Sequence, residues 1–142
     1  MPAGYSGTPL LKKLGVKDGA AGLLVAVPEP IAELNTFDGW ARVKRAKTPR
    51  GVGGGPYDYI HYFSADAPAF EKTLPALKKE LEQNGMIWVS WPKKSSGVPS
   101  TITEDTVRNH ALKIGLVDVK VCAVDEIWSG LKLVIPVKDR KK

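Results

Sequence analysis

The stretch Gly22-Leu23-Leu24-Val25-Ala26-Val27 decides the fold class, because it is a short and unbroken apolar run. Such a run without alternation is typical of a strand buried on both faces, as parallel sheets require. The sequence predicts a brief helix after it, over Pro30 to Phe37, and a more exposed strand over Trp40 to Ala46. Together these segments predict a β-α-β unit.

The same alternation of strand and helix continues along the chain. Tyr57 to Phe63 is aromatic and β-prone and predicts a strand, as does Met86 to Trp91. Between them, Asp66 is expected to cap a helix that Pro75 kinks and that Asn84-Gly85 ends. The apolar stripe of this helix recurs at helical spacing in Phe70, Leu74, Leu77 and Leu81.

The C-terminal third predicts one more helix and two strands. Thr101 and Glu104 fit a capping box at the start of the helix. Val117 to Ala123 alternates with period two and predicts a strand with its valines on one face. Leu131 to Val137 is the expected final strand, and Pro136 within it favours the edge of the sheet.

These elements predict an α/β, three-layer Rossmann-like fold with a mostly parallel sheet and an antiparallel C-terminal edge strand. That layout is similar to the class I methyltransferases. We expect residues 1–142 to form a single Rossmann-like domain. Residues 1–21 are its helical lead-in, where Thr8 is the expected cap, Pro9 begins the helix and Gly15 ends it. Residues 138–142 are a basic tail.

Composition narrows the function classes. The 142 residues carry a net charge of +6, one cysteine and 43% hydrophobic residues. No window approaches the roughly 18 apolar residues of a membrane span, so we expect no membrane partner. A lone cysteine and no leader-like start favour a cytoplasmic protein. The basic excess lies in the tail and in a second group, Arg42, Lys44, Arg45, Lys47 and Arg50.

The first crossover is poorly suited to a nucleotide cofactor bound in the standard mode. Pro28 and Pro30 remove two amide donors from the turn that would wrap the ligand. The second strand ends in Arg45-Ala46-Lys47, without the acid that holds ribose hydroxyls. Histidines, carboxylates and the cysteine show no metal-ligand spacing. The sequence therefore predicts neither a cofactor nor a metal.

A more promising loop follows the strand that ends at Trp91. Lys93 and Lys94 with the hydroxyls of Ser95 and Ser96 can hold an anion, and Trp91 is a further candidate ligand contact. The helix that begins near Thr103 adds a partial positive charge at the same edge of the predicted sheet. The alternative is an exposed, solvated loop.

The turn Asp125 to Gly130 combines two carboxylates with an aromatic ring and a hydroxyl. Asp125 and Glu126 are candidate acid and base, with Lys93 for charge stabilisation. Trp128 and Ser129 are candidate ligand contacts, although a polar hairpin with Trp128 packed on the sheet is the simpler interpretation. Three further side chains are expected to serve packing rather than catalysis: His61, His110 and Cys122.

Several motifs together resemble one bacterial family catalogued as a domain of unknown function. They are Tyr5-Ser6-Gly7-Thr8-Pro9-Leu10 with Lys12-Lys13-Leu14-Gly15, Trp88-Val89-Ser90-Trp91-Pro92-Lys93-Lys94, Thr103-Glu104-Asp105, and Val117 to Asp125 with Trp128-Ser129-Gly130-Leu131-Lys132. The resemblance covers nearly the whole chain. It implies a bacterial cytoplasmic protein and one intact domain, and it supplies no catalytic residues.

Three functions remain open from the sequence. The leading hypothesis is a non-catalytic module that binds a protein partner or a small anionic ligand. The alternative is a divergent small-molecule transferase or hydrolase, which requires the loops at Lys93 and Asp125 to converge. The third is nucleic-acid binding through the basic side chains between Arg42 and Arg50.

Overall fold

The computed structural model describes residues 9–141, and its centre is one six-stranded sheet in the order β2-β1-β3-β4-β6-β5. The strands are β1 (Ala21–Val25), β2 (Arg42–Ala46), β3 (Tyr57–Phe63), β4 (Leu81–Pro92), β5 (Val117–Ala123) and β6 (Trp128–Val134). Strands β1 to β4 pair in parallel, whereas β6 pairs antiparallel with both β4 and β5. The predicted mixed sheet of an α/β fold is therefore confirmed.

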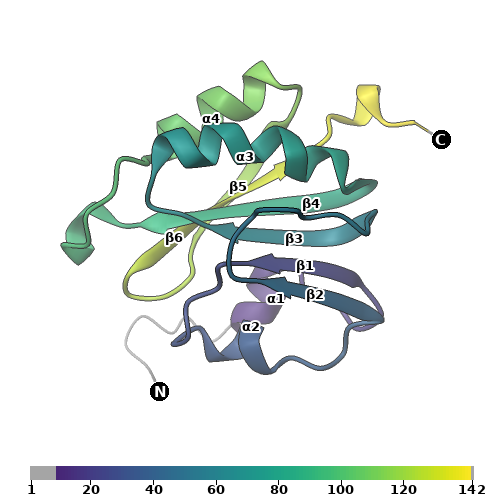
Figure 1. Cartoon of the computed structure of the whole chain (residues 1–142), viewed down its shortest axis with the longest axis horizontal. Helices are drawn as coiled ribbons and strands as arrows, with labels where there is room; N and C mark the ends of the chain where they lie inside the picture. Colours follow the sequence, from purple (N-terminus) through teal and green to yellow (C-terminus); the bar gives the residue numbers. More distant parts are fainter. Residues whose placement is uncertain (1–8, 142) are drawn as a thin grey trace.

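Helices cover both faces of the sheet. One face carries α3 (Ala67–Lys79) and α4 (Glu104–Lys113), and the other carries α1 (Leu10–Leu14) and α2 (Ala32–Thr36), as Figure 1 shows. Two short 3-10 turns, Lys94–Ser96 and Val137–Asp139, complete the regular structure. Among the described residues, no helix has the length and apolar content needed to cross a bilayer.

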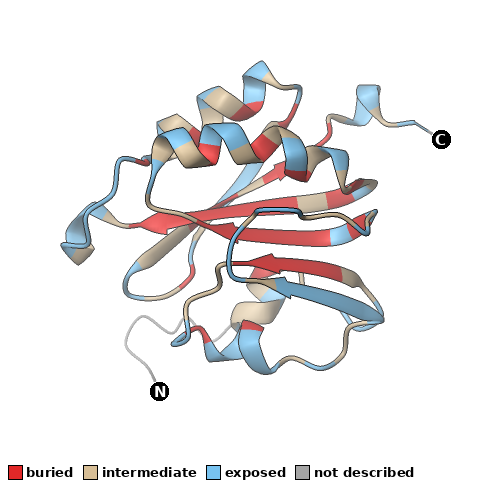
Figure 2. Ribbon diagram, viewed as in Figure 1, coloured by how far each residue is buried: buried red, intermediate tan, exposed pale blue. Residues whose placement is uncertain are grey.

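Each face of the sheet has its own hydrophobic core. The α3/α4 face buries Phe70, Leu74 and Leu77 of the predicted helical stripe against side chains such as Val89 and Leu131. The α1/α2 face buries a second cluster that includes Leu14, Leu24, Leu34, Tyr59, Phe63 and Trp88. Figure 2 shows burial concentrated in β1, β3 and β4, while the edge strand β2 is exposed along its length.

The predicted helix after Asp66 ends earlier than expected. It stops at Lys79, and Leu81 already belongs to β4, so Asn84 and Gly85 lie within a strand. Gly85 fits there because a Cβ would come within 2.9 Å of the carbonyl oxygen of Asp58 on β3. The helical spacing of the apolar residues extends to Leu81, but this residue lies in β4, so strand pairing overrides the local helical pattern there.

The predicted edge position of the last strand is wrong. β6 ends at Val134 and lies between β4 and β5, so β5 forms the edge and Pro136 follows the strand. The expected apolar face of β5 is also incompletely buried, since Val119 and Val121 are 54% and 49% exposed. A register shift between Asp118 and Lys120 disturbs the alternation there.

Two helix starts differ from the prediction. The capping box of α4 uses Thr103 and Thr106 rather than Thr101 and Glu104. The hydroxyl oxygen of each of the two threonines accepts a hydrogen bond from the backbone amide of the other. Thr101 instead accepts a hydrogen bond from the amide of Ala67 at the start of α3. For α1, Pro9 is the cap and not the first helical residue, Gly15 closes the helix as predicted, and Thr8 lies outside the described residues.

Candidate functional site

The carboxyl ends of the parallel strands form the edge at which a sheet of this type binds ligands. The chain crosses over between β2 and β3, so that β1 is flanked by both and the topology switches there. At this point β1 is followed by Ala26, which has a φ of 60°, a left-handed conformation that is uncommon for a residue with a side chain. The chain therefore turns sharply after β1, at the position where a ligand is expected.

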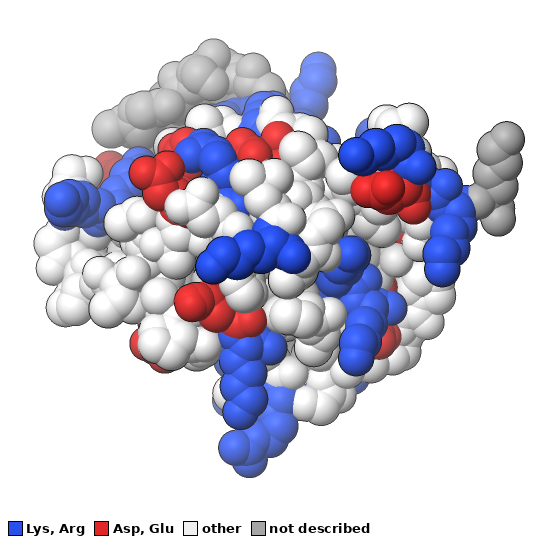
Figure 3. Space-filling model, turned by 90° about the horizontal axis from the view of Figure 1, so that it is seen from above, with Lys and Arg blue, Asp and Glu red and all other residues white. Residues whose placement is uncertain are grey.

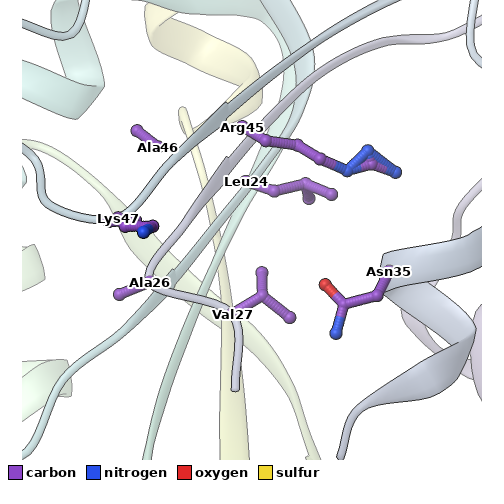
Figure 4. Close-up of a pocket in the computed structure, with 7 residues that line it drawn as sticks. All are labelled: Leu24, Ala26, Val27, Asn35, Arg45, Ala46 and Lys47. Carbon is purple, nitrogen blue, oxygen red and sulfur yellow. The ribbon is translucent and has the colours of Figure 1, made fainter. Parts of the chain in front are cut away.

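A pocket of about 450 Å³ opens beside this turn. Its lining comes from β1, β2 and α2: Leu24, Ala26, Val27, Asn35, Arg45, Ala46 and Lys47. In Figure 4, Arg45 extends from β2 and Asn35 from α2 on either side of the space next to Leu24 and Val27. The lining thus combines apolar side chains with two cationic side chains and no acidic one.

Side-chain contacts fix two polar members of this pocket. The amide nitrogen of Asn35 donates to the carbonyl oxygens of Pro28 and Glu29, at 3.0 and 3.1 Å, and so holds the turn after β1 against α2. Nη2 of Arg45 lies 3.3 Å from the carbonyl oxygen of Leu34 and 3.4 Å from that of Phe37. A guanidinium has five N–H donors, so these two long contacts leave donors for a ligand.

The two predicted loops converge at the same edge. β4 and β6 bring Pro92 opposite Trp128, and the amide of Lys93 donates to the carbonyl oxygen of Ile127 at 2.7 Å. Lys93 and Asp125 therefore lie on neighbouring loops, which is one part of what the transferase or hydrolase hypothesis requires.

Several candidate side chains in these loops have structural partners. Oδ1 of Asp125 accepts hydrogen bonds from the amides of Ile127 and Trp128, at 2.8 and 2.7 Å. The Ser96 hydroxyl donates to the carbonyl oxygen of Lys93 at 2.6 Å. The Trp91 ring is buried in the α3/α4 core, so its side chain does not line the loop.

The remaining candidates are more accessible. Trp128 is half-buried and packs edge-on against Phe63, with ring centroids 5.2 Å apart. Ser129 lies in β6 opposite Ala123 and is also half-buried. Exposed positions are occupied by Lys94, Ser95 and Glu126.

The histidines are packed, as the sequence predicts. His61 is fully buried between the hydroxyl of Tyr59, 2.8 Å from Nδ1, and that of Ser90, 2.7 Å from Nε2. Burial lowers the pKa of His61 to about 3. Because both neighbours are hydroxyls, a neutral imidazole is satisfied in either tautomer. His110 packs edge-on against Phe70, with ring centroids 5.6 Å apart.

One feature of this chemistry, the lining of the pocket, was not found from the sequence. Asn35, Leu24 and Val27 join the pocket only because α2 packs across β1. Cys122 lies half-buried, and burial raises the pKa of its thiol, in keeping with the unreactive side chain that we predicted. Within residues 9–141, no three His, Cys, Asp or Glu side chains are grouped for a metal ion.

The family model described as "Protein of unknown function (DUF3052)" matches residues 60–137, more than half of the chain. The chain belongs to this family. No curated protein sequence matches the chain. Its fold is similar to that of class I methyltransferases of known structure, as the layout of the sequence indicated.

Three solved structures illustrate the likeness. A SAM dependent methyltransferase from Aquifex aeolicus has a TM-score of 0.62 at 16% identity, covering 89% of this chain and 87% of that one. The N-methyltransferase NodS from Bradyrhizobium japonicum has a TM-score of 0.58 at 14% identity, covering 89% and 92%. The B. subtilis tRNA methyltransferase TrmK has a TM-score of 0.58 at 13% identity, covering 92% of this chain and 66% of that one. At such identities the likeness concerns the fold alone.

Proposed function

We propose that this DUF3052 protein is a binding module for a small anionic ligand, which it holds in the pocket between the ends of β1 and β2. The observation that carries the proposal is the pairing of Arg45 and Lys47 in a pocket lining without an acid. Cationic side chains beside an apolar surface suit a ligand with a negatively charged group and an apolar body.

The side chains at the end of β2 also indicate which chemical group of a ligand the pocket prefers. In nucleotide-binding sheets an acid at this position bonds ribose hydroxyls, whereas an arginine accommodates a phosphate. Here Arg45 and Lys47 occupy the end of the strand. A phosphate bound to Arg45 accepts two parallel, charge-assisted hydrogen bonds from the guanidinium, with Lys47 as a point charge nearby.

Adenosylmethionine, the cofactor that the fold family implies, does not fit this lining in the standard mode. Its sulfonium and ammonium groups give the molecule a net positive charge near neutral pH, which Arg45 and Lys47 repel. Its ribose hydroxyls find no carboxylate among the pocket side chains.

Thermal unfolding at fixed low salt tests the proposal, with adenosine monophosphate, adenosine, inorganic phosphate and adenosylmethionine as probes. We expect the monophosphate to raise the melting temperature by several degrees at about 100 times its Kd, with adenosine and adenosylmethionine inactive. The double variant Arg45→Met with Lys47→Met removes the shift. Lys44→Met is the matched control and retains the shift. Lys44 is on the same strand, but it is in register with Leu23, whose side chain faces the α3/α4 core on the other side of the sheet from the pocket.

Two outcomes contradict the proposed site. A shift that survives the double variant but is lost in Lys93→Ala assigns the anion to the Lys93–Gly97 loop. A shift with adenosylmethionine alone supports a methyltransferase instead.

A small-molecule transferase or hydrolase is the second candidate, favoured by the bond between the Lys93 amide and Ile127. Lys93 would stabilise charge. Glu126 would act as base in place of Asp125, because Asp125 already accepts hydrogen bonds from two backbone amides. Turnover that is lost in both Lys93→Ala and Glu126→Gln supports this candidate. Turnover that survives both variants rules it out.

A further inference from the structure

Four lysines gather on the α1 face of the sheet, away from the pocket at the end of β2. Lys13 lies in the last turn of α1 and Lys17 follows the helix, while Lys120 and Lys132 project from β5 and β6. We call these four side chains the lysine cluster.

The strand register brings two of the lysines directly together. Lys120 and Lys132 are opposite each other across β5 and β6. Like charges at directly opposed positions destabilise a sheet, because neighbouring side chains lie only about 5 Å apart. Folding alone therefore does not favour this pair.

The other two lysines add to the same surface. Nζ of Lys120 donates to the carbonyl oxygen of Lys13 at 3.1 Å, which ties β5 to the end of α1. Burial first, and then the charges of Lys120 and Lys17, lower the pKa of Lys132. The described ion pairs do not relieve this repulsion, because all three involve Arg108 and its partners Glu104, Asp105 and Asp118.

The opposite face of the molecule has a different charge pattern. Figure 3 shows basic and acidic side chains next to one another over the helices α3 and α4. Charges of both signs in alternation are the ordinary arrangement of a solvated surface. The lysine cluster differs because it gathers one sign of charge across three separate elements.

We infer that the lysine cluster binds the phosphate backbone of a single-stranded nucleic acid. Lysines contact phosphates as point charges without reading bases, so the binding is expected to be independent of sequence. A small anion is the less suitable ligand, because small-molecule sites are concave and the pocket that we describe lies at the end of β2 instead. This site is separate from the group between Arg42 and Arg50, because that group belongs to β2 and the loop after it, at the opposite edge of the sheet from β5.

Fluorescence anisotropy with a short labelled single-stranded RNA tests the inference at several salt concentrations. The triple variant Lys17→Gln, Lys120→Gln and Lys132→Gln removes three charges from the lysine cluster. Since each phosphate contact contributes about 0.7 to the slope of log K against log salt on a single strand, the slope should lose about 2 in magnitude. Binding at about 100 mM salt should weaken at least tenfold.

The matched control is the triple variant Lys72→Gln, Lys79→Gln and Lys113→Gln, which removes three exposed charges from α3 and α4. It should retain the slope, and circular dichroism should show both triple variants folded. Equal weakening in the two variants would mean that net charge alone drives binding and overturns the inference. Binding to vesicles of anionic lipid without binding to RNA overturns it as well.

Discussion

Nε2 of His61 on β3 lies 2.7 Å from the hydroxyl oxygen of Ser90 on β4, and neither side chain is exposed. The imidazole is stacked on Phe63, with ring centroids 4.3 Å apart, and Tyr59 closes its other side. A serine beside a histidine resembles a nucleophile with its base. Complete burial assigns the pair to the core instead, where the two hydroxyls satisfy a neutral ring.

The buried imidazole should make folding sensitive to acid. The pKa of His61 is about 3 in the fold, and near 6.5 in the unfolded chain. Between these values only the unfolded chain binds the proton, so the free energy of unfolding falls as the pH falls below about 6.5. The loss approaches about 1.4 kcal/mol per pH unit.

Denaturant unfolding from neutral to mildly acidic pH measures this effect, in the native protein and in His61→Gln. Carboxylates titrate in both proteins, so the difference between the two curves isolates His61. We expect the variant to be less stable at neutral pH and to have a shallower acid slope. Parallel curves would contradict a neutral His61 in the folded protein.

Ala26 should be sensitive to the shape of its side chain. Its φ of 60° is a strained conformation for a β-branched residue. Ala26→Val is therefore expected to lower the free energy of unfolding by about 2 kcal/mol or more. Ala26→Gly relieves the strain but loses a packed methyl group, so it should change stability by less than about 1 kcal/mol. Thermal or denaturant unfolding measures both, and equal effects of the two variants would refute the strained turn.

Arg42 should anchor the glycine-rich connection rather than bind a ligand. Its guanidinium donates to the carbonyl oxygens of Gly54 and Pro56 and lies 4.8 Å from the centre of the Tyr57 ring. Arg42→Gln is expected to cost about 1–2 kcal/mol and to speed tryptic cleavage after Arg50. Lys44→Gln, on the same exposed strand, is the control. A variant with native stability and native cleavage would show that these contacts contribute nothing.

Asp125 should matter for the shape of its turn. Because Oδ1 accepts the amides of Ile127 and Trp128, Asp125→Ala leaves two donors without this acceptor and should cost about 1–2 kcal/mol. Asp125→Asn retains an acceptor oxygen and should restore about half of that loss. Intrinsic fluorescence during denaturant unfolding, to which all four tryptophans contribute, measures the stability of both variants. If both variants were as stable as the native protein, a role outside folding would be favoured.

The sequence by itself determined the kinds of elements and the fold class. The apolar run that contains Leu23 and Val25 indicated a strand buried on both faces, and its alternation with helices indicated a parallel sheet with helical layers. Local signals such as Asp66 at the start of α3 also held, because a cap depends only on nearby backbone amides. The packed His61 was also predicted from a local signal, since a histidine in the middle of a buried apolar strand is surrounded by core side chains.

Only the tertiary structure decided strand order, register and the neighbours of each side chain. β6 lies inside the sheet, and Lys120 faces Lys132, because pairing between strands depends on packing across the whole sheet rather than on local pattern. The pocket has the same origin. Arg45 and Asn35 are 10 positions apart in sequence and line one space because α2 packs over the end of β1. Sequence periodicity specifies which face of an element is apolar, and long-range packing then determines which elements meet there.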